Sequence, residues 1–429
     1  MPVFENSVIE LRQKKAAEAL GSDGPLLLIL SGEPLQKPGG LDQTYPFLPQ
    51  PEYYWLSGSR RSGCVMAYEP GKGWTHFVRQ ADPAELLWEG VPEVPQGEDV
   101  STLPAWLAAR GDRPTALLGC AASLPGARLN NDPTLVASAL DKLDRVRRIK
   151  DSAEIVLVGR AAAATAAAFR KAREIIKPGV TERQVQIELE AEMRRHGADG
   201  TSYGTIVGGG THSAVLHFEP GQRRIAAGEL VLVDAGAEVS EYAADVTRTF
   251  PAGDKFTPEQ QAIYDIVLAG QAAGIALCRP GTEWHAVHAA AGAAMAEGLK
   301  DLGILKGSTD SLLETGAIAL FFPHGVGHML GLRVRDVGGR APGRPEGRLC
   351  CGARPRVDMP LEDGFLMTVE PGLYFVPAML DDAGRREQFR DSVAWGGLDR
   401  WRAVGGVRIE DDVLVSGLSP NVLTGMIPK

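Results

Sequence analysis

The sequence has little of what marks a disulfide-stabilised, exported or membrane-spanning protein. Its 5 cysteines form no Cys-x-x-Cys pair, and a disulfide framework is not expected. The charged N-terminal segment contains no apolar stretch of the kind found in secretory signals. The longest candidate apolar run, Leu26 to Leu30, is far too short to cross a bilayer. We therefore expect a reducing, cytoplasmic location and no membrane partner.

An excess of basic residues is also absent. The chain has 45 Lys and Arg residues against 54 Asp and Glu residues, a formal net charge of -9. Because phosphate binding needs a basic surface, we expect no nucleic-acid partner. The short basic cluster of Arg145, Arg147, Arg148 and Lys150 is typical of a solvated helix end. The net charge is compatible with an enzyme that acts on a small substrate.

The composition, the length and a change of sequence pattern along the chain favour two folded domains. Hydrophobic residues make up 44% and charged residues 23% of the 429 residues, as in ordinary globular proteins, and the length exceeds that of one typical domain. Short apolar runs alternate with Pro and Gly turns up to about residue 140, whereas an Ala-rich helical pattern begins at Ile149. We expect a smaller α/β domain over residues 1–148 and a larger α+β domain over residues 149–429.

The larger domain shows helix and hairpin patterns in succession. A capping box of Thr181 and Gln184 predicts a helix that closes at Gly197. Alternation of β-branched residues with glycine punctuation predicts hairpins over residues 202–250 and 364–415. Further helices are predicted from Ile149 to a Pro-Gly stop at residues 178–179, over residues 258–277 and over residues 284–300.

Two aspartates lie on adjacent predicted strands. The segment GELVLVDAGAEVSEYAADVTRTF reads as a strand that ends at Asp234, a turn through Gly236 and a second strand that carries Asp245. Either aspartate alone could merely cap a turn. Two carboxylates that meet across a hairpin favour a cation site.

Histidines and glutamates add further candidate ligands. His324 and His328 stand four residues apart, an interval that lets two histidines share a helix face, although HExxH is absent and unrelated turn or core histidines are the alternative. Glu370 ends a predicted strand before Pro-Gly, and Arg408 and Glu410 alternate onto one strand face, where a plain salt bridge is the alternative.

Four carboxylates and one imidazole form a mixed oxygen and nitrogen ligand set. Such ligands suit Mn²⁺, Co²⁺ or Zn²⁺ better than a thiolate site would. Two divalent ions would neutralise the carboxylates, and a water bridging them becomes hydroxide near neutral pH. That hydroxide is the nucleophile needed to attack an amide carbonyl, so the ligand set predicts hydrolysis.

Four motifs together resemble one family. DAGAEVSEYAADVTRTF, PHGVGHMLGL, TVEPGLYF and GGVRIEDDVLV are similar to motifs of the pita-bread metallopeptidases, the family of aminopeptidase P, prolidase and methionine aminopeptidase. The resemblance covers about residues 150–416. It implies a pita-bread catalytic domain, a creatinase-like N-terminal domain, two divalent metal ions with Mn²⁺ favoured over Co²⁺ or Zn²⁺, and a homodimer. YYWLSG at residues 53–58 resembles a motif of the first domain.

The resemblance assigns a role to each motif residue. Asp234 would chelate one metal, Asp245 and Glu410 would bridge both, and His328 and Glu370 would bind the other. Glu370 would also shuttle the proton from the bridging water. The remaining catalytic or substrate-contacting candidates are His217, His324, Arg408 and Tyr374, although Tyr374 could equally be a core aromatic.

Within the family, the sequence is most similar to prolidase. The long stretch between Glu370 and Glu410 favours that enzyme, and Arg356 matches the arginine that holds the carboxylate of a C-terminal proline, with Arg354 as the neighbouring alternative. Arg335 stands where the family usually has a substrate-contacting histidine. We therefore predict hydrolysis of Xaa-Pro dipeptides. The alternatives are an aminopeptidase P acting on longer peptides, and a non-catalytic binding protein of the same fold.

Overall fold

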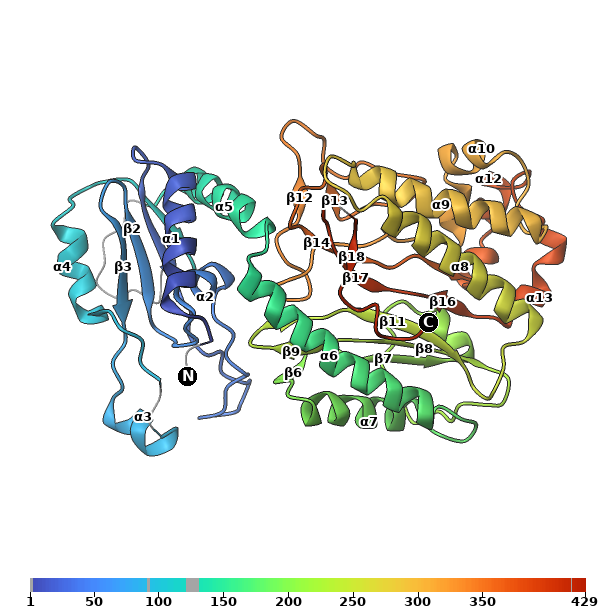
Figure 1. The fold of residues 1–429 in the computed structure, drawn as a ribbon, viewed down its shortest axis with the longest axis horizontal. Helices are drawn as coiled ribbons and strands as arrows, with labels where there is room; N and C mark the ends of the chain where they lie inside the picture. Colours follow the sequence, from blue (N-terminus) through green and yellow to red (C-terminus); the bar gives the residue numbers. More distant parts are fainter. Residues whose placement is uncertain (1–2, 91–92, 121–130, 418) are drawn as a thin grey trace. The chain divides into compact units, whose positions relative to one another are not determined.

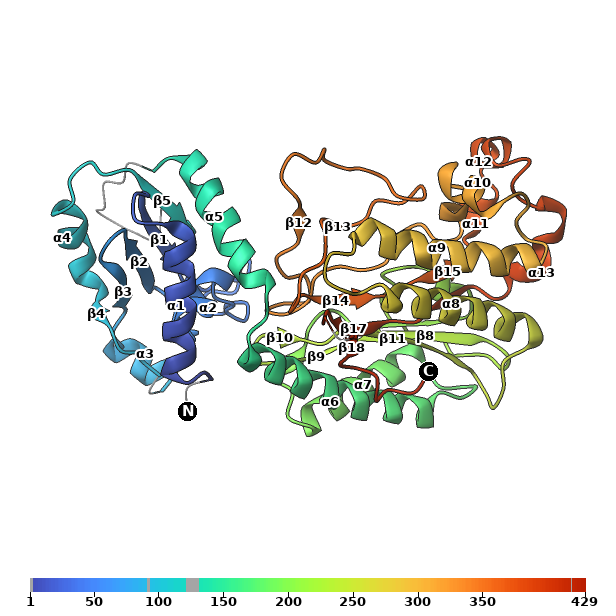
Figure 2. The same ribbon diagram turned by 45° about the horizontal axis from the view of Figure 1, so that its top comes forward.

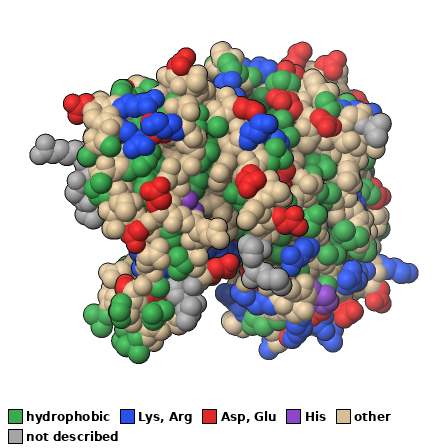
Figure 3. Space-filling view, turned by 60° about the vertical axis from the view of Figure 1, so that its left-hand side comes forward, with side chains coloured by type: hydrophobic (Ala, Val, Ile, Leu, Met, Phe, Trp, Pro, Cys, Tyr) green, Lys and Arg blue, Asp and Glu red, His purple; other side chains and the backbone are tan. Residues whose placement is uncertain are grey.

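The computed structural model describes residues 3–90, 93–120, 131–417 and 419–429. The chain folds into two compact units, Met1–Arg147 and Arg148–Lys429 (Figure 1). Acidic, basic and hydrophobic side chains intermingle over the face drawn in Figure 3.

The first unit is built on a five-stranded mixed sheet in the order β4-β3-β2-β1-β5. Strand β1 pairs antiparallel with β2 and parallel with β5. Leu28, Val65 and Phe77 on the sheet pack against Leu103 and Leu107 of helix α4. The strands are β1 (Leu26–Leu30), β2 (Val65–Glu69), β3 (Gly73–Val78), β4 (Glu98–Asp99) and β5 (Thr115–Leu118). The helices are α1 (Asn6–Leu20), α2 (Pro51–Ser57), α3 (Pro83–Trp88), α4 (Leu103–Ala108) and α5 (Pro133–Arg148).

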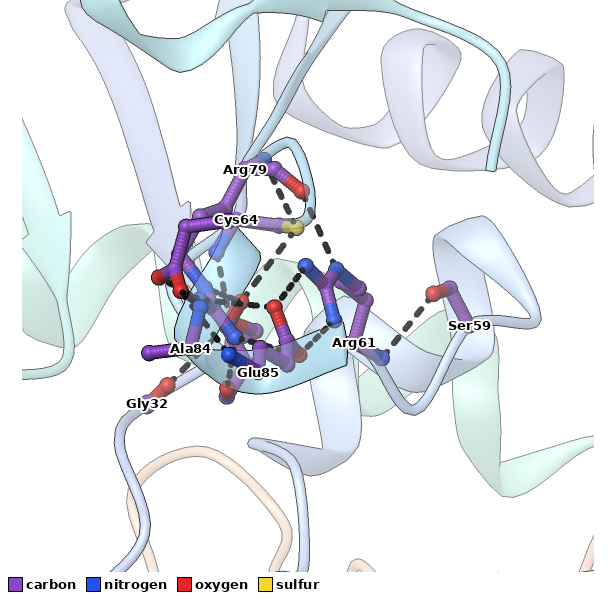
Figure 4. Close-up of polar contacts among 10 residues, drawn as sticks. Gly32, Ser59, Arg61, Cys64, Arg79, Ala84 and Glu85 are labelled. Carbon is purple, nitrogen blue, oxygen red and sulfur yellow. Dashed lines mark hydrogen bonds and ion pairs between the residues drawn. The ribbon is translucent and has the colours of Figure 1, made fainter. Parts of the chain in front are cut away.

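A network of charged side chains ties α3 to this sheet (Figure 4). Arg61 and Arg79 both bind the Glu85 carboxylate, Arg61 Nη2 at 2.8 Å and Arg79 Nη2 at 3.1 Å. These arginines lower the pKa of Glu85, with the Arg61 hydrogen bond as the largest cause. Arg61 and Glu85 also line a cavity of about 930 Å³, which none of the candidate catalytic residues lines.

The second unit places pairs of helices over small antiparallel sheets (Figures 1 and 2). Helices α6 (Ser152–Ile175) and α7 (Glu182–Arg195) pack on each other and against strands of the first half. Those strands are β6 (Gly200–Thr201), β7 (Ile206–Gly209), β8 (Leu230–Ala235), β9 (Ala237–Val239), β10 (Tyr242–Ala243) and β11 (Val246–Pro251). Helix α6 is apolar enough to span a bilayer by composition, but 61% of its most apolar window is buried in the fold.

Helices α8 (Pro258–Ala276) and α9 (Trp284–Asp301) pack together beside the strands of the second half. Strand β14 pairs antiparallel with β17, and β15 pairs antiparallel with β16. The strands are β14 (Leu366–Val369), β15 (Gly372–Tyr374), β16 (Gly406–Arg408), β17 (Asp411–Leu414) and β18 (Asn421–Val422), with a short pair of β12 (Gly339–Arg340) and β13 (Val357–Asp358). Short helices α10 (Thr309–Glu314), α11 (Pro377–Leu380), α12 (Ala383–Gln388) and α13 (Asp399–Arg402) complete this half.

The local signals in the sequence predict the four long helices of the second unit, α6 to α9. The Thr181 and Gln184 capping box is present, and α7, α8 and α9 confirm the three corresponding predictions. The predicted turn at Gly236 is wrong, because the chain reverses at Ser240 and Glu241, whose φ angles are 50° and 70°. Gly236 is instead a point of close approach, where a Cβ atom would lie 1.7 Å from the carbonyl oxygen of Ala244.

Candidate metal centre

Asp234 and Asp245 come together at one end of the β8–β11 pair. Asp234 is the register partner of Thr247, and Asp245 immediately precedes β11. Both residues are buried, with exposed fractions of 8% and 5%. The Asp245 backbone N–H donates to Oδ2 of Asp412 at 3.1 Å, which fixes the chain at this point. The predicted meeting of the two aspartates across a hairpin is therefore present.

Glu410 joins the second half of the fold to these aspartates. Its backbone N–H donates to the carbonyl oxygen of Thr247 at 3.0 Å, and the Thr247 hydroxyl donates to Glu410 Oε2 at 2.6 Å. Glu370 follows β14 directly, and its N–H donates to the Val326 carbonyl oxygen at 2.7 Å. Backbone hydrogen bonds to two separate segments thus hold both glutamates beside the aspartates.

His328 enters this space with one ring nitrogen directed at the carboxylates. Nδ1 donates to the carbonyl oxygen of Met329 at 3.0 Å, which leaves the lone pair of Nε2 free to act as a ligand. Nε2 lies 3.4 Å from Asp245 Oδ2 and 3.8 Å from Glu370 Oε1. This tautomer and orientation are those that a histidine needs when it binds a metal through Nε2.

The helix face that the spacing of His324 and His328 allows is not formed. Residues 322–330 form no helix. The reason is close packing, because a Cβ atom at Gly327 would lie 2.0 Å from the Thr368 carbonyl oxygen and one at Gly325 would lie 3.1 Å from Pro355 Cα. Glycines allow this segment to pass close to its neighbours in an irregular path.

The electrostatics of the cluster fit divalent cations. One ligand atom from each of Asp245, His328 and Glu410 lies within 4.8 Å of the others. Burial raises the pKa of Glu410 well above its usual value, and the neighbouring carboxylates of Asp245 and Glu370 raise it further. Burial likewise raises the pKa of Glu370 to about 7. Cations would compensate this crowding of acidic oxygens, so the donor set fits divalent metal ions.

Arg408 and Tyr374 form a hydrogen-bonded chain beside the acids. Arg408 Nη2 donates to Asp234 Oδ2 at 2.5 Å, and its Nη1 donates to the Tyr374 hydroxyl oxygen at 2.8 Å. Nδ1 of His324 donates to the Gly325 carbonyl oxygen at 2.8 Å, so its Nε2 accepts from the Tyr374 hydroxyl at 2.9 Å. Burial lowers the pKa of His324 to about 3. His324 is therefore neutral and linked to Asp234 through two side chains.

Tyr203 is a further residue of the site, and the sequence alone does not mark it. The Tyr203 hydroxyl donates to Asp234 Oδ1 at 2.6 Å, so Asp234 is held by Tyr203 on one oxygen and by Arg408 on the other. Burial raises the pKa of Tyr203 well above its usual value, so this hydroxyl remains a donor. Tyr203 lies in a bend between β6 and β7, where no local pattern marks it.

Three predicted substrate residues lie outside this hydrogen-bonded chain. His217, Arg335 and Arg356 are exposed, as is the alternative Arg354. Partial burial lowers the pKa of Arg356, the Arg335 guanidinium lowers it further, and Glu370 opposes both. Arg356 is thus within electrostatic reach of both Arg335 and Glu370. No hydrogen bond or ion pair joins His217 to the cluster among the described residues.

Residues 157–417 match metallopeptidase family M24. This match covers more than half of the 429 residues, and the chain belongs to this family of pita-bread metallopeptidases. Residues 9–99 match the aminopeptidase P N-terminal domain, which assigns the chain to the creatinase and aminopeptidase P group. The predicted pita-bread fold with a smaller N-terminal domain is confirmed, and membership of the family implies divalent metal ions.

Individual relatives extend over most of the chain. A probable Xaa-Pro aminopeptidase of Fusarium vanettenii is 31% identical over 440 residues, covering 98% of this chain and 92% of the relative. Xaa-Pro aminopeptidase of Escherichia coli is 40% identical over 284 residues, covering 66% of this chain and 58% of the relative. The structure of Pseudomonas aeruginosa aminopeptidase PepP is similar with a TM-score of 0.79 at 29% identity, covering 100% of this chain and 97% of that one.

Proposed function

We propose that the protein is an Xaa-Pro aminopeptidase that uses two divalent metal ions to release the residue that precedes proline. Mn²⁺ is the favoured metal. The observation that carries the proposal is the burial of Asp245, His328 and Glu410 with their ligand atoms within 4.8 Å of one another. The names of the relatives support this reading over the prolidase reading of the sequence.

Five residues would hold the metal ions. Asp234, Asp245, His328, Glu370 and Glu410 supply oxygen and nitrogen donors of the type that Mn²⁺, Co²⁺ and Zn²⁺ accept. When bound, such ions lower the pKa of a water ligand and polarise the peptide carbonyl. The hydrogen bonds that Asp234 accepts from Tyr203 and Arg408 restrict its rotation, so it presents a fixed orientation.

The residues around the ligands would handle protons and substrate. Glu370, whose Oε1 lies 3.8 Å from His328 Nε2, would accept and return a proton during hydrolysis, as the family resemblance implies. His324 is neutral and hydrogen-bonded to Tyr374, so it would contact the substrate as a dipole and not as a cation. Arg408 positions both Tyr374 and Asp234 and remains charged.

A dipeptidase is the second candidate, and one specific observation favours it. Arg356 lies within electrostatic reach of Glu370, where its guanidinium could bind the free carboxylate of an Xaa-Pro dipeptide. In a longer peptide, proline has no free carboxylate. The two functions therefore differ in whether Arg356 binds the substrate's C-terminus.

A peptide-length series separates the two candidates. Xaa-Pro, Xaa-Pro-Yaa and longer peptides would be assayed with Mn²⁺, Co²⁺ and Zn²⁺. An aminopeptidase cleaves the tripeptide and longer peptides at least as well as the dipeptide. A dipeptidase cleaves the dipeptide alone, and Arg356→Ala raises its KM, whereas the exposed and unrelated Arg390→Ala does not. Inactivity on every peptide with every metal would overturn both.

A further inference from the structure

A second cluster of metal-ligating side chains lies outside the carboxylate centre. It consists of His288 from α9 and the adjacent cysteines Cys350 and Cys351, with one ligand atom of each within 4.8 Å of the others. His288 is fully buried and the cysteines are partly buried. We propose that these three residues form a binding site for one thiophilic divalent cation of the Zn²⁺ class, with solvent completing the coordination.

The separation of the sulfur atoms matches a chelating pair. The two Sγ atoms lie 3.8 Å apart. Two thiolates that are each about 2.3 Å from a tetrahedral Zn²⁺ ion lie about 3.8 Å apart, so the sulfurs need not move to share one ion. The Cys350 thiol now donates to the carbonyl oxygen of His285 at 3.4 Å, and an arriving ion would replace that proton.

The backbone holds both thiols at this separation. Cys350 and Ala353 exchange two backbone hydrogen bonds of 2.8 and 3.0 Å, and the turn residues Cys351 and Gly352 have φ angles of 52° and 82°. This is the left-handed conformation of a two-residue hairpin turn, which cysteine rarely adopts. A Cβ atom at Gly352 would lie 2.8 Å from Gly316 Cα, so this turn position requires glycine.

His288 supplies the third ligand. Its ring stacks on Phe322 at a centroid distance of 4.9 Å and an interplanar angle of 25°. The Val326 N–H donates to Nδ1 at 3.1 Å, so the proton of the neutral ring lies on Nε2, which is directed at the Cys350 backbone. Binding of a cation at Nε2 requires that proton to leave or to move to Nδ1.

The ligand types separate this site from the carboxylate centre. Thiolate ligands favour soft or borderline ions such as Zn²⁺ and Cd²⁺, whereas the oxygen-rich centre accepts harder ions such as Mn²⁺. Mn²⁺ should therefore occupy the carboxylate centre and leave the thiol site free. Cys64, Cys120 and Cys278 are not part of this cluster, so they serve as internal controls.

Occupation of the site should disturb the proposed catalytic centre. Because Nδ1 of His288 now accepts a hydrogen bond, the neutral ring carries its proton on Nε2. An ion on Nε2 would move that proton to Nδ1, and the Val326 N–H would lose its acceptor. Val326 lies two residues before His328, and its carbonyl oxygen accepts the Glu370 N–H. The expected effect on catalysis rests on the proposed peptidase function.

Cobalt absorption tests the site without any enzyme assay. The full chain, reduced and treated with a chelator, would be loaded with Mn²⁺ and titrated with Co²⁺ while the thiolate-to-cobalt charge-transfer absorption is recorded. We expect a band that saturates at one equivalent, that falls by more than half in Cys350→Ser and in Cys351→Ser, and that persists in Cys120→Ser. Absence of the band in the folded parent chain, or its persistence in the double serine variant, would overturn the site.

Peptide hydrolysis tests separately whether a metal ion at the thiol site disturbs the proposed catalytic centre. One equivalent of Cd²⁺ should lower Xaa-Pro-Yaa hydrolysis by the Mn²⁺-loaded parent at least about threefold and leave the Cys350→Ser/Cys351→Ser variant unchanged. Equal inhibition of both proteins would overturn the coupling. A preparation that hydrolyses no peptide would contradict the proposed function, and the cobalt band would still decide whether the thiol site exists.

Discussion

Arg408 donates from Nη2 to Oδ2 of Asp234 at 2.5 Å, and both side chains are buried. The contact joins β16 to β8, so the two halves of the larger unit meet through an ion pair at the candidate metal centre. Because Arg408 also holds Tyr374 and the Thr247 hydroxyl, its removal should affect more than one site residue.

We predict that Arg408→Met destabilises the metal-free protein by about 3–5 kcal/mol, because it leaves the Asp234 carboxylate buried and unpaired. Addition of Mn²⁺ should restore part of this loss, since a cation at Asp234 replaces the missing charge. Urea unfolding with chelator and with Mn²⁺ measures both effects. Arg390→Met, which removes an exposed arginine, is the matched control and should change stability by less than about 0.5 kcal/mol. Equal losses in the two variants would count against a buried pair.

Metal binding should depend steeply on pH. In the metal-free protein, burial raises the pKa of Glu370 from 4.5 to about 7 and raises that of Glu410 well above its usual value. Because a bound cation requires ionised carboxylates, Mn²⁺ affinity should rise as pH increases through about 7, with release of protons. Calorimetry in two buffers of different ionisation enthalpy measures this release. An observed enthalpy that is the same in both buffers would contradict the prediction.

The same shifts fix the sign of the pH dependence of stability. A carboxyl group whose pKa is raised on folding stabilises the fold below its unfolded value and loses that effect as pH rises through its folded value. For Glu370 this window runs from 4.5 to about 7. The metal-free protein should therefore become less stable across that range, whereas the Mn²⁺-loaded protein should not. Thermal unfolding at several pH values with and without Mn²⁺ tests this difference.

His217 and His212 provide a matched pair of histidines. Nδ1 of His212 lies 2.7 Å from the buried Glu182 carboxylate, whereas His217 is exposed. We expect His212→Ala to cost about 1–3 kcal/mol of stability, because Glu182 loses a partner. His217→Ala should lower kcat/KM at least about tenfold with an unchanged unfolding midpoint, if His217 contacts substrate as the family resemblance implies. An unaltered kcat/KM in the second variant would remove His217 from the site.

Arg335 stands where the family usually has a histidine, and its substitution tests whether this difference affects substrate preference. The guanidinium stays protonated and can only donate, whereas a histidine at this position could also accept a proton. We expect Arg335→His to shift the ratio of kcat/KM values between Xaa-Pro-Yaa peptides of different Yaa charge, with stability unchanged because Arg335 is exposed. Identical kinetics on every peptide would exclude a direct role for Arg335.

The sequence predicts those parts of the site that local patterns encode. Asp234 and Glu370 each lie at or directly after a strand, and Thr181 and Gln184 begin a helix, so strand and capping signals locate them. The contacts that orient the site are different in kind. Tyr203 reaches Asp234 from an irregular bend, and no periodicity or turn signal marks such a residue.

Backbone packing explains the predictions that failed. The interval between His324 and His328 fits a helix, but Gly325 and Gly327 allow neighbouring chain segments so close that the helix is excluded. The turn assigned to Gly236 lies instead at Ser240 and Glu241, which adopt left-handed conformations that their residue types do not signal. Tertiary contacts between distant segments decide both cases, and a single sequence does not reveal them.

We propose that the carboxylates and His328 bind two metal ions that hydrolysis requires. The most direct measurement is the Mn²⁺ content per chain after chelator treatment and Mn²⁺ loading, recorded together with Xaa-Pro-Yaa hydrolysis, for the parent protein and for Asp245→Asn, with Asp391→Asn as an exposed control. We predict two equivalents of Mn²⁺ and full activity for the parent and the control, and fewer than two equivalents with loss of hydrolysis for Asp245→Asn. A chelator-treated parent that hydrolyses peptide at its full rate without metal would contradict the claim.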